Sequence, residues 1–159
     1  MDSFSSSQAP EPVGHYPHAR RVGDLLFLSG VGPRSRGTKR IPGVELDAEG
    51  NIVSYDIETQ VRSVFQNVKW ILEDAGSSCE KIVDVTVFLT NMKDDLDIQN
   101  RLWKEYFEQG PSSRTPSGIN GRPTPSLLAG RRSSSEAAAP RFIIRRVVMA
   151  PGGRTATSS

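Results

Sequence analysis

The chain has 159 residues, a length typical of one domain, and its 20 basic and 18 acidic side chains leave a formal net charge of only +2. No apolar run is long enough for a signal peptide or a membrane span, so we expect a cytoplasmic protein. Because Cys79 is the single cysteine, an internal disulfide and a metal site made only of thiolates are excluded. A lone cysteine is more often a small buried residue than a nucleophile.

The first elements predicted along the chain are two strands that follow a polar N-terminus. Residues 1–11 are rich in Ser, Pro and Gln, a composition that favours disorder. The segments 18–22 and 25–29 flank Gly23-Asp24, which suits the two-residue turn of a hairpin. The second strand begins Leu-Leu-Phe-Leu and is apolar on both faces, so we expect both faces to be covered.

The next segments predict a short hairpin and then a long helix. Residues 44–46 and 52–54 surround a turn of polar residues. Asp56 is a suitable N-cap for a helix that continues to about Ala75, and Gly76 is a plausible residue after its C-terminus. Apolar residues recur there with the helical period, at Ile57, Val61, Val64, Phe65, Val68, Ile71 and Leu72.

A third strand and a second helix complete the order. Residues 83–89 alternate with the period of a strand, and a helix is predicted from about Asp95 to Gln109. Both helices are amphipathic, so we expect an α+β fold with two helices packed on one face of a sheet. Since the strand 25–29 is apolar on both sides, oligomerisation through the other sheet face is expected.

Several segments together are similar to one known family. They are 16–33, which ends Leu-Phe-Leu-Ser-Gly-Val-Gly-Pro; 56–69; 71–76, which reads Ile-Leu-Glu-Asp-Ala-Gly; 83–89; and the Arg114-Thr115 pair. With their order and spacing, they resemble the RidA/YjgF family of enamine/imine deaminases, and we assign residues 12–125 to a RidA-like domain. The loop 30–38 resembles the branch often labelled 2-aminomuconate deaminase.

The resemblance implies a fold, an assembly and a reaction. The fold would be a chorismate mutase-like mixed sheet with two helices, and three subunits would form a central barrel with ligand sites in the clefts between them. The reaction would be hydrolysis of reactive 2-enamine or 2-imine carboxylates, possible substrates including 2-aminomuconate, to 2-oxo acids and ammonia. An imine carbon is already electrophilic, so no cofactor or metal is expected.

Four residues are candidates for this chemistry. Arg114 could bind the substrate carboxylate through two parallel hydrogen bonds, although without the resemblance it would pass for a surface arginine. Ser29 could donate a hydrogen bond to substrate or water, or merely satisfy the backbone. Tyr16 could cap the cleft or transfer a proton, or simply pack, and Asn100 could bind substrate or be an exposed polar residue.

Two other groups of polar residues do not predict a metal site. His15 and His18 are three residues apart, but Pro17 opposes the helix on which such a pair binds metal. Asp94, Asp95 and Asp97 are better explained as charges that stabilise a helix N-terminus.

The C-terminal segment 126–159 departs from the family pattern. It is rich in Ser, Arg and Ala, and its one candidate strand is 141–149. Arg145 and Arg146 would place one arginine on each face of that strand, so we expect an edge position or no strand. Glu136 is a poor substitute for the carboxylate of the family's closing strand.

Two explanations of this tail stay open: a rebuilt C-terminal edge, or an altered reading frame or splice form. A proline after Arg114-Thr115 also argues against a central strand there. The basic residues that gather after Arg114 suggest an alternative function, a non-catalytic trimeric protein that binds a ligand or RNA, although a nucleic-acid partner is not our first expectation.

Overall fold

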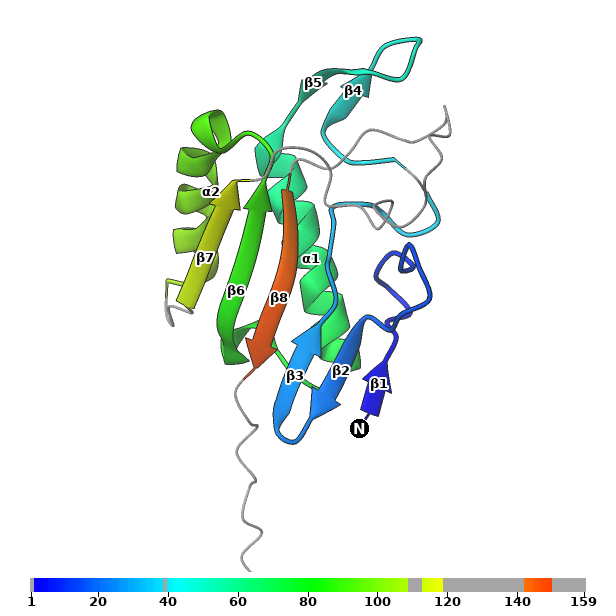
Figure 1. The fold of residues 1–159 in the computed structure, drawn as a ribbon, viewed down its shortest axis with the longest axis vertical. Coiled ribbons are helices and arrows are strands. Elements are labelled where there is room, and N and C mark those ends of the chain that lie inside the picture. The colour runs from blue at the N-terminus through cyan, green and yellow to red at the C-terminus, as the bar shows by residue number, and fades with distance from the viewer. Residues whose placement is uncertain (1, 39, 109–112, 119–141, 150–159) are drawn as a thin grey trace, which may run out of the picture.

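The computed structural model describes residues 2–38, 40–108, 113–118 and 142–149. Figure 1 shows a mixed sheet with both long helices behind it. The elements are β1 (Asp2–Phe4), β2 (Ala19–Val22), β3 (Leu25–Leu28), β4 (Val44–Leu46), β5 (Ile52–Tyr55), α1 (Ile57–Asp74), η1 (Cys79–Lys81), β6 (Ile82–Leu89), α2 (Met92–Tyr106), β7 (Ser113–Gly118) and β8 (Phe142–Met149). The predicted α+β class with two helices on one face of the sheet is therefore confirmed.

The main sheet has six strands in the order β1-β2-β3-β8-β6-β7. All neighbours are antiparallel except β6 and β7, which are parallel. A separate hairpin of β4 and β5 projects from the body of the molecule, as Figure 1 shows. Within the described ranges, no helix combines the length and the apolar composition that a membrane crossing needs.

Helix α1 confirms the prediction made for it. Asp56 is its N-cap, and the side chain accepts hydrogen bonds from the backbone N–H groups of Glu58 and Thr59. Gly76 follows the helix with a φ of 72°, a left-handed conformation that glycine adopts at little energetic cost. All seven residues of the predicted apolar stripe are buried, and they pack against β3 and β6 in one core.

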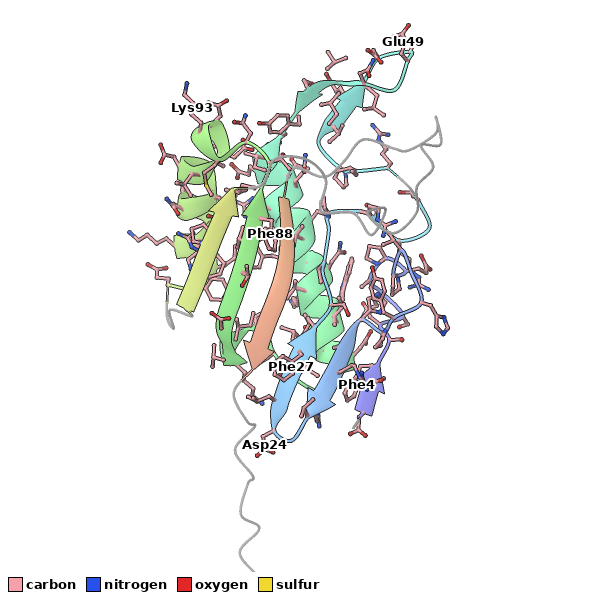
Figure 2. The ribbon with its side chains drawn as sticks, viewed as in Figure 1. Phe4, Asp24, Phe27, Glu49, Phe88 and Lys93 are labelled. Carbon is pink, nitrogen blue, oxygen red and sulfur yellow. The ribbon has the colours of Figure 1, made fainter. Side chains whose placement is uncertain are left out.

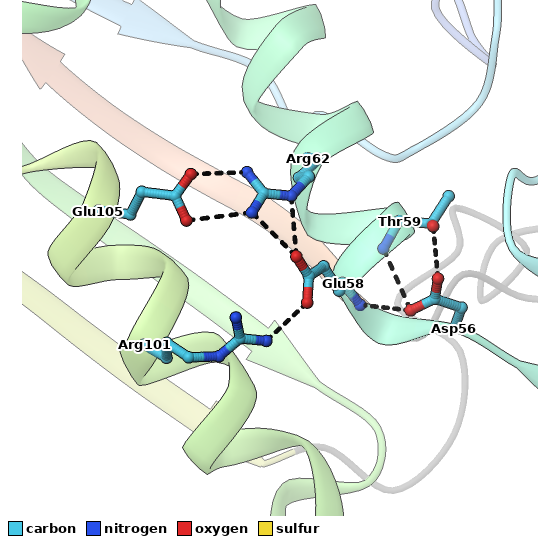
Figure 3. A network of polar contacts seen from close by, with 6 residues as sticks. All are labelled: Asp56, Glu58, Thr59, Arg62, Arg101 and Glu105. Carbon is cyan, nitrogen blue, oxygen red and sulfur yellow. Dashed lines mark hydrogen bonds and ion pairs between the residues drawn. The ribbon is translucent and has the colours of Figure 1, made fainter.

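Charged side chains connect α1 to α2 across their exposed sides, as Figure 3 shows. Arg62 donates hydrogen bonds to Glu58 on its own helix and to both carboxylate oxygens of Glu105 on α2. Arg101 of α2 donates in return to Glu58. These groups are exposed to water, so each pair stabilises the fold only weakly. Their geometric effect is to hold α2 against α1 in one register.

The N-terminal segment is ordered, so the prediction of disorder for residues 1–11 is wrong for residues 2–11. Strand β1 pairs with β2, and the side chains of Ser6 and Ala9 are buried. The composition suggested disorder because the segment has few apolar residues. Its order depends on polar contacts with distant residues, which composition does not reveal.

Strand β8 corrects the expectation for residues 141–149. It lies between β3 and β6, in the interior of the sheet rather than at an edge. The register of β6 and β8 shifts so that Thr86 is opposite Arg146 and Val87 is opposite Ile144, which leaves Arg145 as a bulge residue. A bulge interrupts the strict alternation on which the objection to this strand depended.

Strand β7 shows how a proline can be accommodated. Pro116 lies opposite Val87 of β6, and β7 is the last strand of the sheet. An edge strand has one side without a neighbour, so a residue with no N–H group is tolerated there. The remainder of the segment 126–159, with Glu136, lies outside the described residues.

Candidate functional site

A small pocket lies beside the end of β3. It is lined by residues 9–12, 16, 18, 29–32, 34 and 71, and it has a volume of about 40 Å³. Since one buried water needs about 10–15 Å³ of such space, the pocket can hold roughly three waters or one small polar group. It contains two of the predicted site residues, Tyr16 and Ser29.

The N-terminal segment forms one wall of this pocket. His18, which is buried, contacts the segment through both ring nitrogens: Nδ1 accepts from the backbone N–H of Ser6 at 2.9 Å, and Nε2 lies 2.8 Å from the carbonyl oxygen of Pro10. These partners require Nε2 to carry the proton and donate it. Arg36 adds a hydrogen bond to the carbonyl of Ala9 and an ion pair with Glu11.

Helix α1 positions the opposite wall, the loop 30–34. The side-chain amide of Asn67 donates to the carbonyl oxygens of Gly32 and Arg34, each at 2.9 Å. Ser63 donates from its hydroxyl to the carbonyl of Pro33 at 2.7 Å. Because both side chains come from a rigid helix, the loop is fixed relative to Ser29.

Ser29 and Tyr16 both line this pocket, but Ser29 is held by hydrogen bonds whereas Tyr16 is partly exposed to solvent. The Ser29 hydroxyl donates to the carbonyl of Pro17 at 2.7 Å, so its proton is engaged while its lone pairs can still accept. The Ser29 backbone N–H donates to the carbonyl of His18. Tyr16 is 37% exposed, which places its ring at the mouth of the pocket.

Arg114 lies elsewhere, on the edge strand β7, against the adjacent face of α2. Its Nη1 donates to Oε1 of Gln99 at 2.7 Å, and its Nη2 donates to Oδ1 of Asn100 at 2.6 Å. Its guanidinium carbon lies 5.0 Å from the centre of the Trp103 ring, within the range of a cation–π contact. One face of α2 therefore contacts the guanidinium at three points.

The surroundings of Arg114 make its charge available to an anion. Trp103 is fixed from below by aromatic contacts with Phe65 and Phe107, at centroid distances of 6.0 and 4.3 Å. Burial lowers the pKa of Arg114, although a guanidinium stays protonated in proteins. Among the residues that the structure describes, no carboxylate forms an ion pair with it.

The four predicted residues thus form two pairs. Tyr16 and Ser29 share the pocket, and Arg114 and Asn100 share a hydrogen bond. The pairs are separated in one chain, because β8 and β6 lie between β3 and β7. Sequence reasoning did not single out Gln99 as a contact of Arg114, and the only available signal was a polar residue on an otherwise apolar helix face.

The groups considered for metal or thiol chemistry have other contacts. In the described ranges, no three His, Cys, Asp or Glu side chains cluster in a way that could hold a metal ion. Asp95 is buried and accepts a hydrogen bond from the Tyr55 hydroxyl, so it connects β5 to α2. Burial raises the pKa of Cys79, which disfavours the reactive thiolate.

The fold and its two polar clusters define a small α+β protein, and comparison with known proteins identifies its family. A family model described as endoribonuclease L-PSP matches residues 6–120. A RutC family protein of Pyrococcus abyssi is 34% identical over 124 residues, which cover 77% of this chain and 87% of that protein. The chain therefore belongs to this family, known also as RidA/YjgF.

Two further relatives bear on structure and activity. A Thermotoga maritima protein described as a candidate endoribonuclease has a solved structure that covers 96% of this chain and all of its own, with a TM-score of 0.71 and 27% identity. A protein of Dermatophagoides farinae named 2-iminobutanoate/2-iminopropanoate deaminase is 28% identical over 117 residues, covering 73% of this chain and 81% of that protein.

Proposed function

We propose that this chain is an enamine/imine deaminase that hydrolyses 2-imino carboxylates to 2-oxo acids and ammonia. One observation carries the proposal: Arg114 is a half-buried cation, held by Gln99 and Asn100, without a carboxylate partner among the described residues. A partly desolvated cation without a counter-ion favours the binding of an anion. The deaminase name of the mite relative supports the choice of an imino carboxylate.

Arg114 binds and orients the carboxylate of the substrate. A guanidinium has five N–H donors, and Gln99 and Asn100 accept from one donor on each Nη atom. The remaining donors can form a pair of parallel hydrogen bonds with a carboxylate. Fixing the carboxylate also fixes the adjacent imine carbon, which reduces the entropic cost of reaching the transition state.

The pocket beside Ser29 supplies the water. Water adds through its oxygen to the imine carbon, the C–N bond then breaks, and both water protons end on the nitrogen, which leaves as ammonia. Ser29 can accept a hydrogen bond from the imine N–H or from the water, because its own proton is donated to Pro17. Tyr16, at the mouth of the pocket, is the candidate for proton transfer.

A trimer joins the two halves of this site. In one chain the pocket of about 40 Å³ is too small for a whole imino acid, and Arg114 lies beyond two intervening strands. In the trimer that we propose, Arg114 and Asn100 of one subunit face Tyr16 and Ser29 of its neighbour. The same assembly covers the sheet face that carries Leu25, which is 38% exposed in the single chain.

Two compounds are candidate substrates. The loop 30–38 suggests 2-aminomuconate, whereas the mite relative is named for 2-iminobutanoate and 2-iminopropanoate.

The second candidate function, ligand or RNA binding without catalysis, rested on basic residues after Arg114 that lie mostly outside the described part of the chain. No described contact favours it.

The test measures imine hydrolysis directly. An amino-acid oxidase or dehydratase generates 2-iminobutanoate in place, and 2-aminomuconate is supplied in a separate assay. Ammonia and the 2-oxo acid are followed with and without the protein. Since imines also hydrolyse spontaneously, the expected result is a protein-dependent increase over that background, proportional to the amount of protein. A rate equal to the background for both 2-iminobutanoate and 2-aminomuconate contradicts the proposal.

A further inference from the structure

Gln99 is an unusual residue for its place in the fold. It lies on α2 with a fully buried side chain, at 0% exposure. A buried amide is unfavourable unless its donor and acceptor groups both have partners. The Gln99 Oε1 atom accepts from Arg114, but among the described residues its Nε2 group has no partner.

The contact with Arg114 determines which way the Gln99 amide is turned. Arg114 presents only donors, so the oxygen of Gln99 must face it and the NH₂ group must point away. The opposite orientation would place two donors against each other. An apolar residue of the same length would avoid the buried NH₂ group, so the fold alone does not require glutamine at this position.

We infer that Gln99 is a positioning residue, which sets the direction of the Arg114 guanidinium for binding the carboxylate of a 2-imino acid. The inference rests on the proposed function. Asn100 also contacts the guanidinium, but it is exposed, whereas Gln99 is enclosed by the core and has little freedom to move. Gln99 accepts from Nη1 of the guanidinium and Asn100 accepts from Nη2, while the Trp103 ring forms a cation–π contact with the same group.

Two substitutions separate orientation from charge. Gln99→Met keeps length and burial but removes the acceptor, so the guanidinium loses its direction. We expect kcat/KM to fall about tenfold or more, through both a higher KM and a lower kcat, because a hydrogen bond to a charged group is lost. Gln99→Glu keeps the acceptor but neutralises the local charge, so KM should rise while kcat at saturation stays within about threefold of the unmodified protein.

The matched control is Gln60→Met. Gln60 is likewise a fully buried glutamine, but it lies on α1 and has no described contact with Arg114. We expect it to leave kcat and KM within about twofold. Gln99→Met should not lower the midpoint of thermal unfolding more than Gln60→Met does. The Nε2 group that Gln99→Met removes is buried and has no described partner, so its removal costs little stability.

The closing experiment combines imine hydrolysis with calorimetric binding of 2-oxobutanoate, a 2-oxo acid product that needs no turnover. A weaker affinity of Gln99→Met for 2-oxobutanoate, by about tenfold, together with the kcat and KM pattern above, supports the inference. Unchanged kinetics and affinity in Gln99→Met overturn it and leave the proposed function intact. Absence of both hydrolysis and 2-oxobutanoate binding in the unmodified protein contradicts the proposed function itself, and the inference with it.

Discussion

Asp56 illustrates how much one residue contributes to this fold. Its carboxylate accepts from the backbone N–H groups of Glu58 and Thr59, at 3.0 and 3.3 Å, and from the Thr59 hydroxyl at 2.5 Å. The Thr59 hydroxyl bond is the largest cause that lowers the pKa of Asp56 from its ordinary value of 3.8. A folded-state pKa below the unfolded value means that the ionised cap stabilises the protein above about pH 4, and that this contribution is lost as the pH falls through the folded pKa.

Removal of this cap should therefore destabilise the protein in a pH-dependent way. Asp56→Ala should lower the free energy of unfolding by about 1 kcal/mol at pH 7. Asp56→Asn, which keeps an acceptor without the charge, should lose less, and its difference from the unmodified protein should narrow below about pH 4. Urea titrations at several pH values measure both. A difference for Asp56→Asn that grows as the pH falls would contradict the assignment.

At the residue scale, the sequence offers candidate side chains but does not show their partners. Arg114 and Asn100 were both candidates, but nothing in a linear sequence shows that β7 places Arg114 over α2. Gln99 was missed because a single polar residue on a helix has many ordinary explanations. For Ser29 the sequence leaves open whether the hydroxyl donates to substrate, to water or to the backbone, and its donation to Pro17 leaves Ser29 as an acceptor.

At the scale of elements, the sequence predicts those helices and strands whose formation depends on local signals. Helix α1 begins, ends and buries its stripe as expected, because capping, helical period and the terminal glycine all agree. Strand β8 and the N-terminal segment were misjudged because long-range pairing decides them. Two adjacent arginines argued against a central strand, and only the register reveals the bulge at Arg145.

The N-terminal segment offers a prediction about how an element is held in place. His18 accepts from Ser6 and lies within hydrogen-bonding distance of the Pro10 carbonyl. His18→Leu removes both bonds with little change in bulk, so backbone amides of residues 6–11 should exchange with solvent at least about tenfold faster. His18→Gln retains one acceptor and one donor and should restore part of the protection.

Hydrogen exchange followed by mass spectrometry measures this effect. Peptides from α1 serve as the internal control, because its buried stripe does not depend on His18. Equal exchange of residues 6–11 in the unmodified protein and His18→Leu would show that Arg36 and Asp74, which also contact this segment, are sufficient to hold it.

At the scale of the whole molecule, the sheet has one face covered by helices and one that is not. Leu26 and Leu28 are buried against the helices, whereas the alternate residues Leu25 and Phe27 are more exposed, and Figure 2 labels Phe27 on the sheet face turned away from the helices. Phe88 of β6, which alternates with buried neighbours, is also only partly buried. An apolar sheet face of this kind suggests contact with other copies of the chain.

The proposed trimer predicts the mass of the protein in solution. Sedimentation equilibrium should report about three times the 17.4 kDa of the chain. Phe27→Lys places a charge on the proposed interface and should shift the protein towards monomer. Lys69→Ala, at an exposed position on α1 on the helix side of the sheet, is the control and should leave the mass unchanged. A stable, folded monomer at micromolar concentration would rule out the proposed joining of the two half-sites.

The central claim is that Arg114 binds the carboxylate of an imine that this protein hydrolyses. Its most direct test is kcat/KM for 2-iminobutanoate in Arg114→Ala, Arg114→Lys and the control Arg101→Ala. The control removes an arginine of α2 itself, whose described partner is Glu58 of α1. Because Arg114→Ala loses a charged bidentate contact, its kcat/KM should fall about a hundredfold. Arg114→Lys should recover part of that loss, since an ammonium lacks the planar fork of a guanidinium. Arg101→Ala should change kcat/KM by no more than about twofold. Hydrolysis by Arg114→Ala at the rate of the unmodified protein, with the fold intact, would contradict the claim.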